Sequence, residues 1–125
     1  MYHYKNANLT FMDIDALVYW KELSLIALAL PGAVAATSYG TPAFKVNKKL
    51  MARLKEDGKT LVVYTFDRDI WMKRNPKTFF INDHYKDHPM MLIDLASVKK
   101  KELKELLLAS WKIRAPEKLL KEMKK

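Results

Sequence analysis

The sequence predicts one α+β domain, in which an N-terminal helix and a C-terminal helix pack against an antiparallel sheet. Two observations predict this class. Apolar residues recur at helical spacing near both ends of the chain, and runs of β-branched and aromatic residues lie between them. The chain has 125 residues, half of them hydrophobic, which is enough for one core and too few for a second full domain. Residues 1–125 are therefore expected to form a single domain.

The first expected element is a helix over about residues 10–30. Thr10 and Asp13 offer caps for its N-terminus, and Pro31 with Gly32 ends it. Its apolar side chains recur every three or four residues: Ile14, Leu17, Val18, Leu25, Ile26 and Ala29. This spacing is typical of one face of a helix.

A three-stranded antiparallel meander follows, over residues 44–46, 50–54 and 60–66. Asn47 with Lys48 suits a hairpin tip, and Gly58 marks the second turn. Strand alternation directs five side chains toward the core: Phe44, Val46, Leu50, Ala52 and Leu54.

The second half of the chain alternates again between the two kinds of element. Asp67 caps a short helix that ends near Asn75, because the proline that follows disfavours helical backbone there. Residues 78–81 and 90–95 are expected to form two strands, the second of them central, on either side of the polar loop 82–89.

A last long helix is expected from Ser97, and Pro116 separates it from a short amphipathic tail. Its apolar stripe is made of Leu103, Leu106, Leu107, Ser110 and Trp111.

Composition excludes several classes of protein. The chain has no cysteine, which excludes disulfides, thiolate metal sites and cysteine nucleophiles. The long apolar stretch 16–36 is interrupted by Lys21, Glu22 and Pro31, so no membrane helix is expected. The opening residues lack the profile of a secretory signal, and we expect a cytoplasmic protein without a cofactor.

The charge is strongly positive and unevenly distributed. Lys and Arg total 23 against 14 Asp and Glu, a formal net charge of +9. Residues 1–44 carry a net charge of −1, and residues 45–125 carry +10. Such a balance favours polyanionic partners. Because lysines far outnumber arginines, contacts to the phosphate backbone are better supported than reading of bases.

The first candidate site is the face of the meander opposite its apolar side chains. Alternation places four cations on this wing face, with Lys48 at the tip, and the next segment adds the charge of Lys73, Arg74 and Lys77. The four are Lys45, Lys49, Arg53 and Lys55. Cations spaced along a strand could follow a phosphate backbone, although a lysine-rich edge is also a common defence against aggregation.

A second candidate is formed by three consecutive lysines, Lys99, Lys100 and Lys101, at the expected start of the last helix. Positive charge is unfavourable there, and a bound anion would relieve it. The alternative is that these lysines are exposed and screened by salt.

Two further groups of residues are candidate sites. The loop 83–88 contains two histidines and two aspartates, residue types that bind metals or transfer protons. Asn82 and Pro89 oppose the helix that would align the two histidines, and no metal is expected. A possible aromatic pocket comprises Tyr39, Gly40, Phe44, Phe79, Tyr85 and Trp111. The same aromatic residues could instead be core and rim packing.

Motifs of catalysis are absent from the sequence. The three glycines form no phosphate-binding loop, and no serine lies in a nucleophile elbow. Acidic pairs lie beside expected helix starts, where carboxylates serve as caps. The sequence therefore favours a protein that is not an enzyme and has no catalytic residues.

A chain of short signatures in a fixed order resembles one known family. They are Leu30-Pro31-Gly32, Ser38 to Val46, Lys49, Ala52-Arg53-Leu54, Asp57-Gly58, Thr78 to Ile81, Asp83-His84-Tyr85 and Leu107 to Pro116 around Trp111. In this order they resemble the MmcQ/YjbR family over about residues 25–120. The resemblance implies a small bacterial single-domain α+β protein, likened to a double-wing DNA-binding architecture.

These observations together predict a non-enzymatic protein that binds DNA through phosphates with little sequence preference. Because lysines predominate among the cations, DNA binding is expected to be sensitive to salt. The protein is expected to be a monomer. Two alternatives remain open. One is a module that binds a small ligand or a protein at the aromatic pocket, and the other is a protein whose charge serves only solubility.

Overall fold

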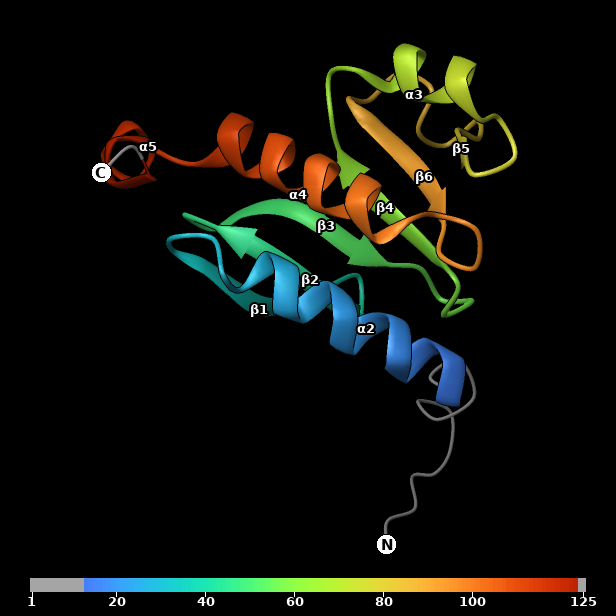
Figure 1. Ribbon diagram of the computed structural model, residues 1–125, viewed down its shortest axis with the longest axis horizontal. Coiled ribbons are helices and arrows are strands. Elements are labelled where there is room, and N and C mark those ends of the chain that lie inside the picture. Colours follow the sequence, from blue (N-terminus) through green and yellow to red (C-terminus); the bar gives the residue numbers. More distant parts are fainter. Residues whose placement is uncertain (1–12, 124–125) are drawn as a thin grey trace, which may run out of the picture.

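The computed structural model describes residues 13–123, which form one α+β domain as predicted (Figure 1). The elements are α2 (Ile14–Ala27), β1 (Ala33–Ser38), β2 (Thr41–Val46), β3 (Lys49–Leu54), β4 (Thr60–Tyr64), α3 (Arg68–Arg74), β5 (Phe79–Phe80), β6 (Met90–Asp94), α4 (Lys100–Arg114) and α5 (Glu117–Met123). The strands make a six-stranded antiparallel sheet in the order β1-β2-β3-β4-β6-β5. Strand β6 is an inner strand, as expected. In this part of the chain, no helix has both the length and the apolar character needed to cross a membrane.

Strand β1 was not expected from the sequence. It consists of Ala, Val, Thr and Ser, and its alanines have low strand propensity. It is held by full pairing with β2, from Ala33 opposite Val46 to Ser38 opposite Thr41. The two-residue loop between them has positive φ at Tyr39 and Gly40. Tertiary pairing therefore outweighs the weak local preference.

The hairpin between β2 and β3 confirms the expected tip but contains an irregularity. Asn47 and Lys48 both have positive φ, as a tight hairpin loop requires. A bulge lies in this pair, since Phe44 is opposite Ala52 whereas the next residue of β2 is opposite Leu50. Met51 is thereby fully buried and Leu50 only half-buried, so the prediction that Leu50 faces the core is wrong.

Helix α2 is capped by Asp13, whose Oδ1 accepts from the backbone N–H of Ala16 at 2.9 Å. The expected cap at Thr10 lies outside the described residues. The buried positions of α2 are Ala16, Leu23 and Ala27, and Trp20 stacks on Phe44 at 4.3 Å between ring centroids. Most of the predicted apolar stripe instead faces outward, with exposed fractions of 78% for Ile14, 54% for Leu17, 50% for Val18 and 68% for Leu25.

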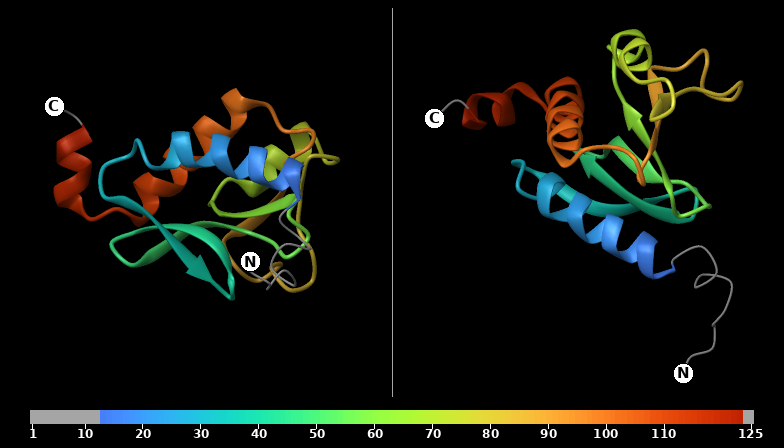
Figure 2. Two further views of the ribbon diagram at one scale, coloured as in Figure 1. Left: turned by 90° about the horizontal axis from the view of Figure 1, so that it is seen from below. Right: turned by 45° about the vertical axis from the view of Figure 1, so that its right-hand side comes forward.

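The main core lies between the sheet and the helices α2 and α4, which run side by side on one face (Figure 2). All five side chains of the predicted α4 stripe are buried. Trp111, the last residue of this stripe, donates its indole N–H to the carbonyl of Pro31 at 2.7 Å. The hydroxyl of Ser110 donates to the carbonyl of Met51 at 3.0 Å, which fixes α4 on β3.

A smaller core lies on the opposite face of the sheet. Its buried members are Val62, Tyr85 and Leu92, with Phe80 and Met90 packed against them. Tyr85 belongs to the loop between β5 and β6, so this loop covers the second face. The centre of the sheet is therefore buried on both sides, whereas the sequence predicted an open wing face.

The turn between β3 and β4 depends on one carboxylate. Asp57 Oδ1 accepts from the backbone N–H groups of Lys59 and Thr60, both at 2.9 Å, and Oδ2 accepts from the Thr60 hydroxyl at 2.7 Å. Partial burial alone raises the pKa of Asp57, but these hydrogen bonds outweigh it and hold the pKa below its ordinary value of 3.8.

Replacing Asp57 with asparagine is therefore expected to reduce the free energy of unfolding by about 1 kcal/mol at pH 7. Because the pKa is lower in the folded state, this stabilisation is present above the unfolded-state pKa and disappears as pH falls through the folded-state pKa. Urea denaturation of both proteins at pH 7 and near pH 3 measures the difference. A difference that is the same at both pH values would contradict a role for the ionised carboxylate.

Candidate nucleic-acid interface

Arg53 does not belong to an exposed wing face. Only 6% of it is exposed, because its strand position lies opposite Ala43 and Val62 on the face that the β5–β6 loop covers. Its guanidinium donates to the hydroxyls of Thr41 and Tyr85, both at 3.1 Å. The prediction that Arg53 contacts phosphate is therefore wrong.

Electrostatic contacts with Glu56 and Tyr39 stabilise the buried Arg53 side chain. Glu56 lies 3.4 Å from the Arg53 guanidinium, and the ring of Tyr39 stands over it at 5.3 Å. Burial lowers the pKa of Arg53, but the interactions with Tyr85 and Glu56 raise it by more, so the net shift is upward. Arg53 is a permanent cation that joins β3 to the loop above it.

The remaining lysines of the wing face lie at two separate places along the hairpin. Lys48 and Lys49 are exposed at the hairpin tip, and Lys45 is half-buried nearby on β2. Lys55 follows the other end of β3, where the acidic Glu56 comes next. Without Arg53 between them, these lysines form one group of three near the hairpin tip and a single lysine, Lys55, at the other end of β3.

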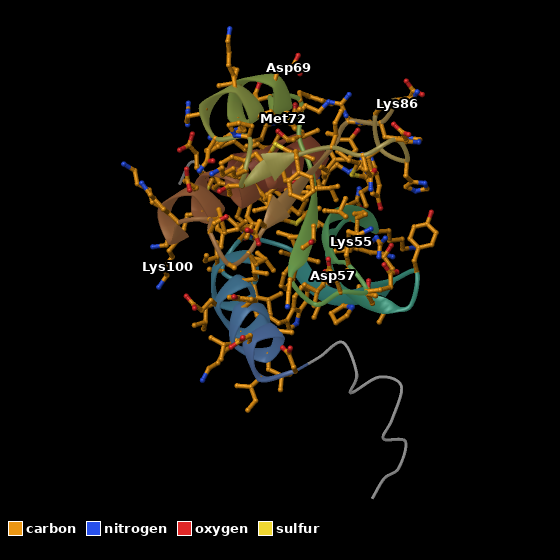
Figure 3. The ribbon with its side chains drawn as sticks, turned by 90° about the vertical axis from the view of Figure 1, so that its right-hand side faces the viewer. Lys55, Asp57, Asp69, Met72, Lys86 and Lys100 are labelled. Atoms are coloured by element: carbon orange, nitrogen blue, oxygen red, sulfur yellow. The ribbon has the colours of Figure 1, made fainter. Side chains whose placement is uncertain are left out.

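Another set of cations is brought together by the pairing of β5 with β6. The hydroxyls of Thr78 and Ser97 are 2.8 Å apart, and the backbone N–H of Asp94 donates to the Thr78 carbonyl at 2.8 Å. Lys77, which precedes Thr78, is therefore close to the segment that leads from Ser97 into α4. We call the six cations of these two segments the basic end: Lys73, Arg74, Lys77, Lys99, Lys100 and Lys101. In Figure 3, Lys100 projects outward from the start of α4, below α3.

The basic end is exposed at all six positions. Within residues 13–123, the one ion pair within 4.0 Å joins Arg53 and Glu56, so none of the six is neutralised by such a contact. The Arg74 guanidinium lies 4.7 Å from the ring centroid of the Trp71 indole, which holds it at the surface. At the start of α4, Glu102 accepts from the backbone N–H of Lys99 at 2.9 Å and offsets part of the like charge there.

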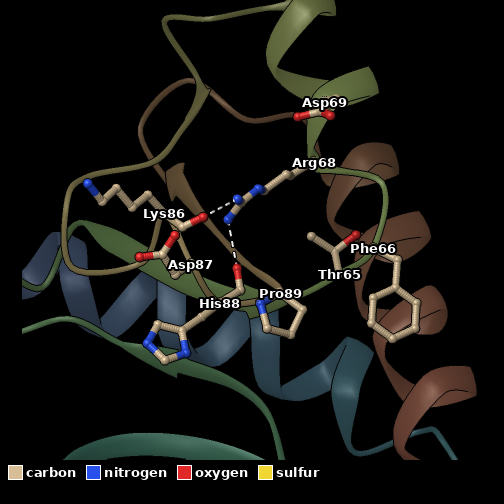
Figure 4. A pocket seen from close by; sticks show the side chains of 8 residues that line it. All are labelled: Thr65, Phe66, Arg68, Asp69, Lys86, Asp87, His88 and Pro89. Carbon is tan, nitrogen blue, oxygen red and sulfur yellow. Dashed lines mark hydrogen bonds between the residues drawn. The ribbon is translucent and has the colours of Figure 1, made fainter.

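An open pocket of about 320 Å³ lies beside the β5–β6 loop (Figure 4). Its lining consists of Thr65, Phe66, Arg68, Asp69, Lys86, Asp87, His88 and Pro89. Arg68 donates to the backbone carbonyls of Tyr85 at 2.9 Å, His88 at 2.7 Å and Met90 at 3.1 Å, and also to that of Lys86. Because its guanidinium donates to these four carbonyls, Arg68 has a structural role: it holds the β5–β6 loop in its folded conformation. The sequence contains no local signal for this role.

The loop residues do not form a metal site of the kind considered above. His84 and His88 are exposed, and their ring centroids are 6.4 Å apart. Among residues 13–123 there is no group of three or more His, Asp or Glu side chains that could hold a metal ion.

The six residues of the proposed aromatic pocket are not brought together. Phe44, Phe79 and Trp111 are fully buried in the main core, and Tyr85 lies in the smaller core. Tyr39 is 85% exposed on the β1–β2 loop, where Gly40 follows it. The pocket prediction is therefore wrong, because the packing of a small core accounts for the buried rings.

Comparisons with known proteins agree with the fold. The structure is similar to the crystal structure of Deinococcus radiodurans protein DR2400, a DUF419-domain protein, with a TM-score of 0.65 and 18% identity. The similarity covers 75% of this chain and 76% of that protein. Among curated proteins no match was found. The model of the YjbR family matches residues 28–113, which is most of the chain, and the protein therefore belongs to the YjbR family, as its short signatures indicated.

Proposed function

We propose that the protein binds DNA through its phosphates, with little sequence preference, at the basic end, and that it does so without catalysing a reaction. One observation carries the proposal. The contact between Thr78 and Ser97 puts two lysine-rich segments side by side, and their six cations are exposed and form no ion pair with any residue of 13–123. This arrangement suits a polyanion better than the separated lysines of the wing face.

The side chains of the basic end are suited to contacting the phosphate backbone of DNA rather than to recognising its bases. Five of the six cations are lysines, which are flexible point charges and do not make the bidentate pattern that distinguishes guanine. Each phosphate that is neutralised releases condensed counterions, which makes affinity fall with salt. If all six cations engage, the slope of log affinity against log salt is expected to approach about −5.

Replacing Lys77 and Lys101 with glutamate is expected to weaken binding of a labelled duplex at least tenfold at low salt. It should also reduce the salt slope by about two, because two phosphate contacts are lost. Fluorescence anisotropy at several salt concentrations measures both quantities. Both side chains are exposed, and glutamate is favourable in the first turn of α4, so folding should be preserved.

The matched control replaces Lys48 and Lys49 at the hairpin tip with glutamate. Each pair of substitutions changes the formal net charge from +9 to +5. The control is expected to weaken binding less than about threefold, since long-range attraction alone is affected. Equal losses in the two variants would reject the basic end as the site, and absence of binding by the unaltered protein at low salt would reject the function.

A further inference from the structure

Helix α2 presents an apolar surface to solvent. Its outer stripe consists of Ile14, Leu17, Val18, Leu25 and Leu28, and the last of these is the C-cap residue, 44% exposed. Together they expose on the order of 500 Å² of side chain, near the upper limit for the largest apolar patch of a typical monomer. The opposite side of α2 already fills the main core. The outer stripe is therefore a second apolar face of the same helix.

Four of the five residues of the outer stripe are symmetric about Lys21, and Val18 is the exception because Ser24 takes its mirror position. Ile14 and Leu28 lie seven residues to either side of it, and Leu17 and Leu25 lie four residues to either side. In an antiparallel pair of α2 helices centred on Lys21, Ile14 would face Leu28 of the other copy and Leu17 would face Leu25. A two-fold interface needs this kind of self-complementary pattern.

The charge of the chain favours the same pairing. Leu25 shares an open groove with Lys100 and Lys104 of α4, and antiparallel pairing brings this end of α2 toward the start of the other copy's α2, where Asp13 and Asp15 lie. A two-fold axis near Lys21 also sets the two lysines near each other, a like-charge contact that the neighbouring Glu22 of each copy offsets in part.

From this geometry we propose that two copies of the chain associate through the outer stripe, with the two α2 helices antiparallel about an axis near Lys21. The pair would bury about 1,000 Å² in total, at the small end of specific interfaces. A dissociation constant in the micromolar range is expected. Because the contact is mostly apolar, the association should persist at high salt. This inference does not depend on the proposed DNA binding.

Sedimentation velocity at protein concentrations from about 1 to 200 μM tests the proposal. The unaltered protein is expected to shift from monomer to dimer over this range. Replacing Leu17 and Leu25 with glutamate should keep it monomeric throughout, an effect of at least thirtyfold on the dissociation constant. The side chains of Leu17 and Leu25 are more than half exposed, so the variant should unfold at nearly the same temperature as the unaltered protein. Ile70→Glu is the control for an exposed apolar side chain outside the outer stripe, since Ile70 is 56% exposed on α3, and this variant should dimerise normally.

A crosslinking experiment tests the predicted axis. The chain has no cysteine, so Lys21→Cys introduces one thiol at the predicted axis. A short bis-maleimide should join two copies of this variant at concentrations where Ile70→Cys remains mostly unlinked. A monomer at the highest concentration, or equal crosslinking of both variants, would overturn the proposal. So would a monomer that sediments with anionic vesicles through the outer stripe.

Discussion

Replacing Trp111 with alanine is expected to lower the free energy of unfolding by about 4 kcal/mol, a large share of the stability usual for a small domain. Trp111 is fully buried among side chains of α2, α4 and the sheet. The substitution removes the largest side chain of the core and leaves a cavity, and it also removes the indole N–H that donates to Pro31. Urea denaturation followed by far-ultraviolet circular dichroism measures the change.

Trp111→Phe keeps the prediction testable if the alanine variant does not fold. Phenylalanine retains most of the buried surface but cannot donate to Pro31, so a loss of about 2 kcal/mol is expected. The hydrogen bond spans 80 residues and ties the turn after α2 to the end of α4. A phenylalanine variant as stable as the unaltered protein would show that this bond contributes nothing to holding the two helices together.

The class of the fold and most elements follow from the sequence because their signals are local. Helix α4 has its stripe on one side and polar residues on the other, so its buried face is unambiguous. Helix α2 has apolar residues around most of its circumference. Alanines at 16 and 27 allow the close approach that buries one side, and spacing alone could not identify which side that would be.

The candidate site was predicted less well because its geometry depends on contacts between distant residues. Arg53 alternates correctly with its neighbours on β3, yet Tyr85, 32 residues later, covers it. The bulge opposite Phe44 changes the alternation in the same hairpin. Conversely, Lys77 and Lys99 are 22 residues apart in sequence, and the pairing of β5 with β6 brings their segments together. Composition predicted how much positive charge the surface carries, and topology determines where it gathers.

The second large effect is expected from Arg68, whose guanidinium holds the loop that covers the smaller core. Replacing Arg68 with alanine leaves the carbonyls of Tyr85, His88 and Met90 without their shared donor. The loop then loses the contacts that keep Tyr85 against Val62 and Leu92. We expect a loss of about 2–3 kcal/mol in the free energy of unfolding, and faster proteolysis within residues 82–89.

Arg68→Lys distinguishes the geometry of the guanidinium from its charge. A lysine ammonium keeps the charge but cannot reach several carbonyls in the fixed fork of an arginine, so it should recover less than half of the lost stability. Hydrogen exchange at the Thr65 amide, which donates to the Pro89 carbonyl at 3.0 Å, reports whether the loop stays closed. Full recovery by lysine would mean that charge alone holds the loop. Because Arg68 lies outside the basic end, the lysine variant should bind duplex DNA as the unaltered protein does, which separates the stability of the loop from the proposed function.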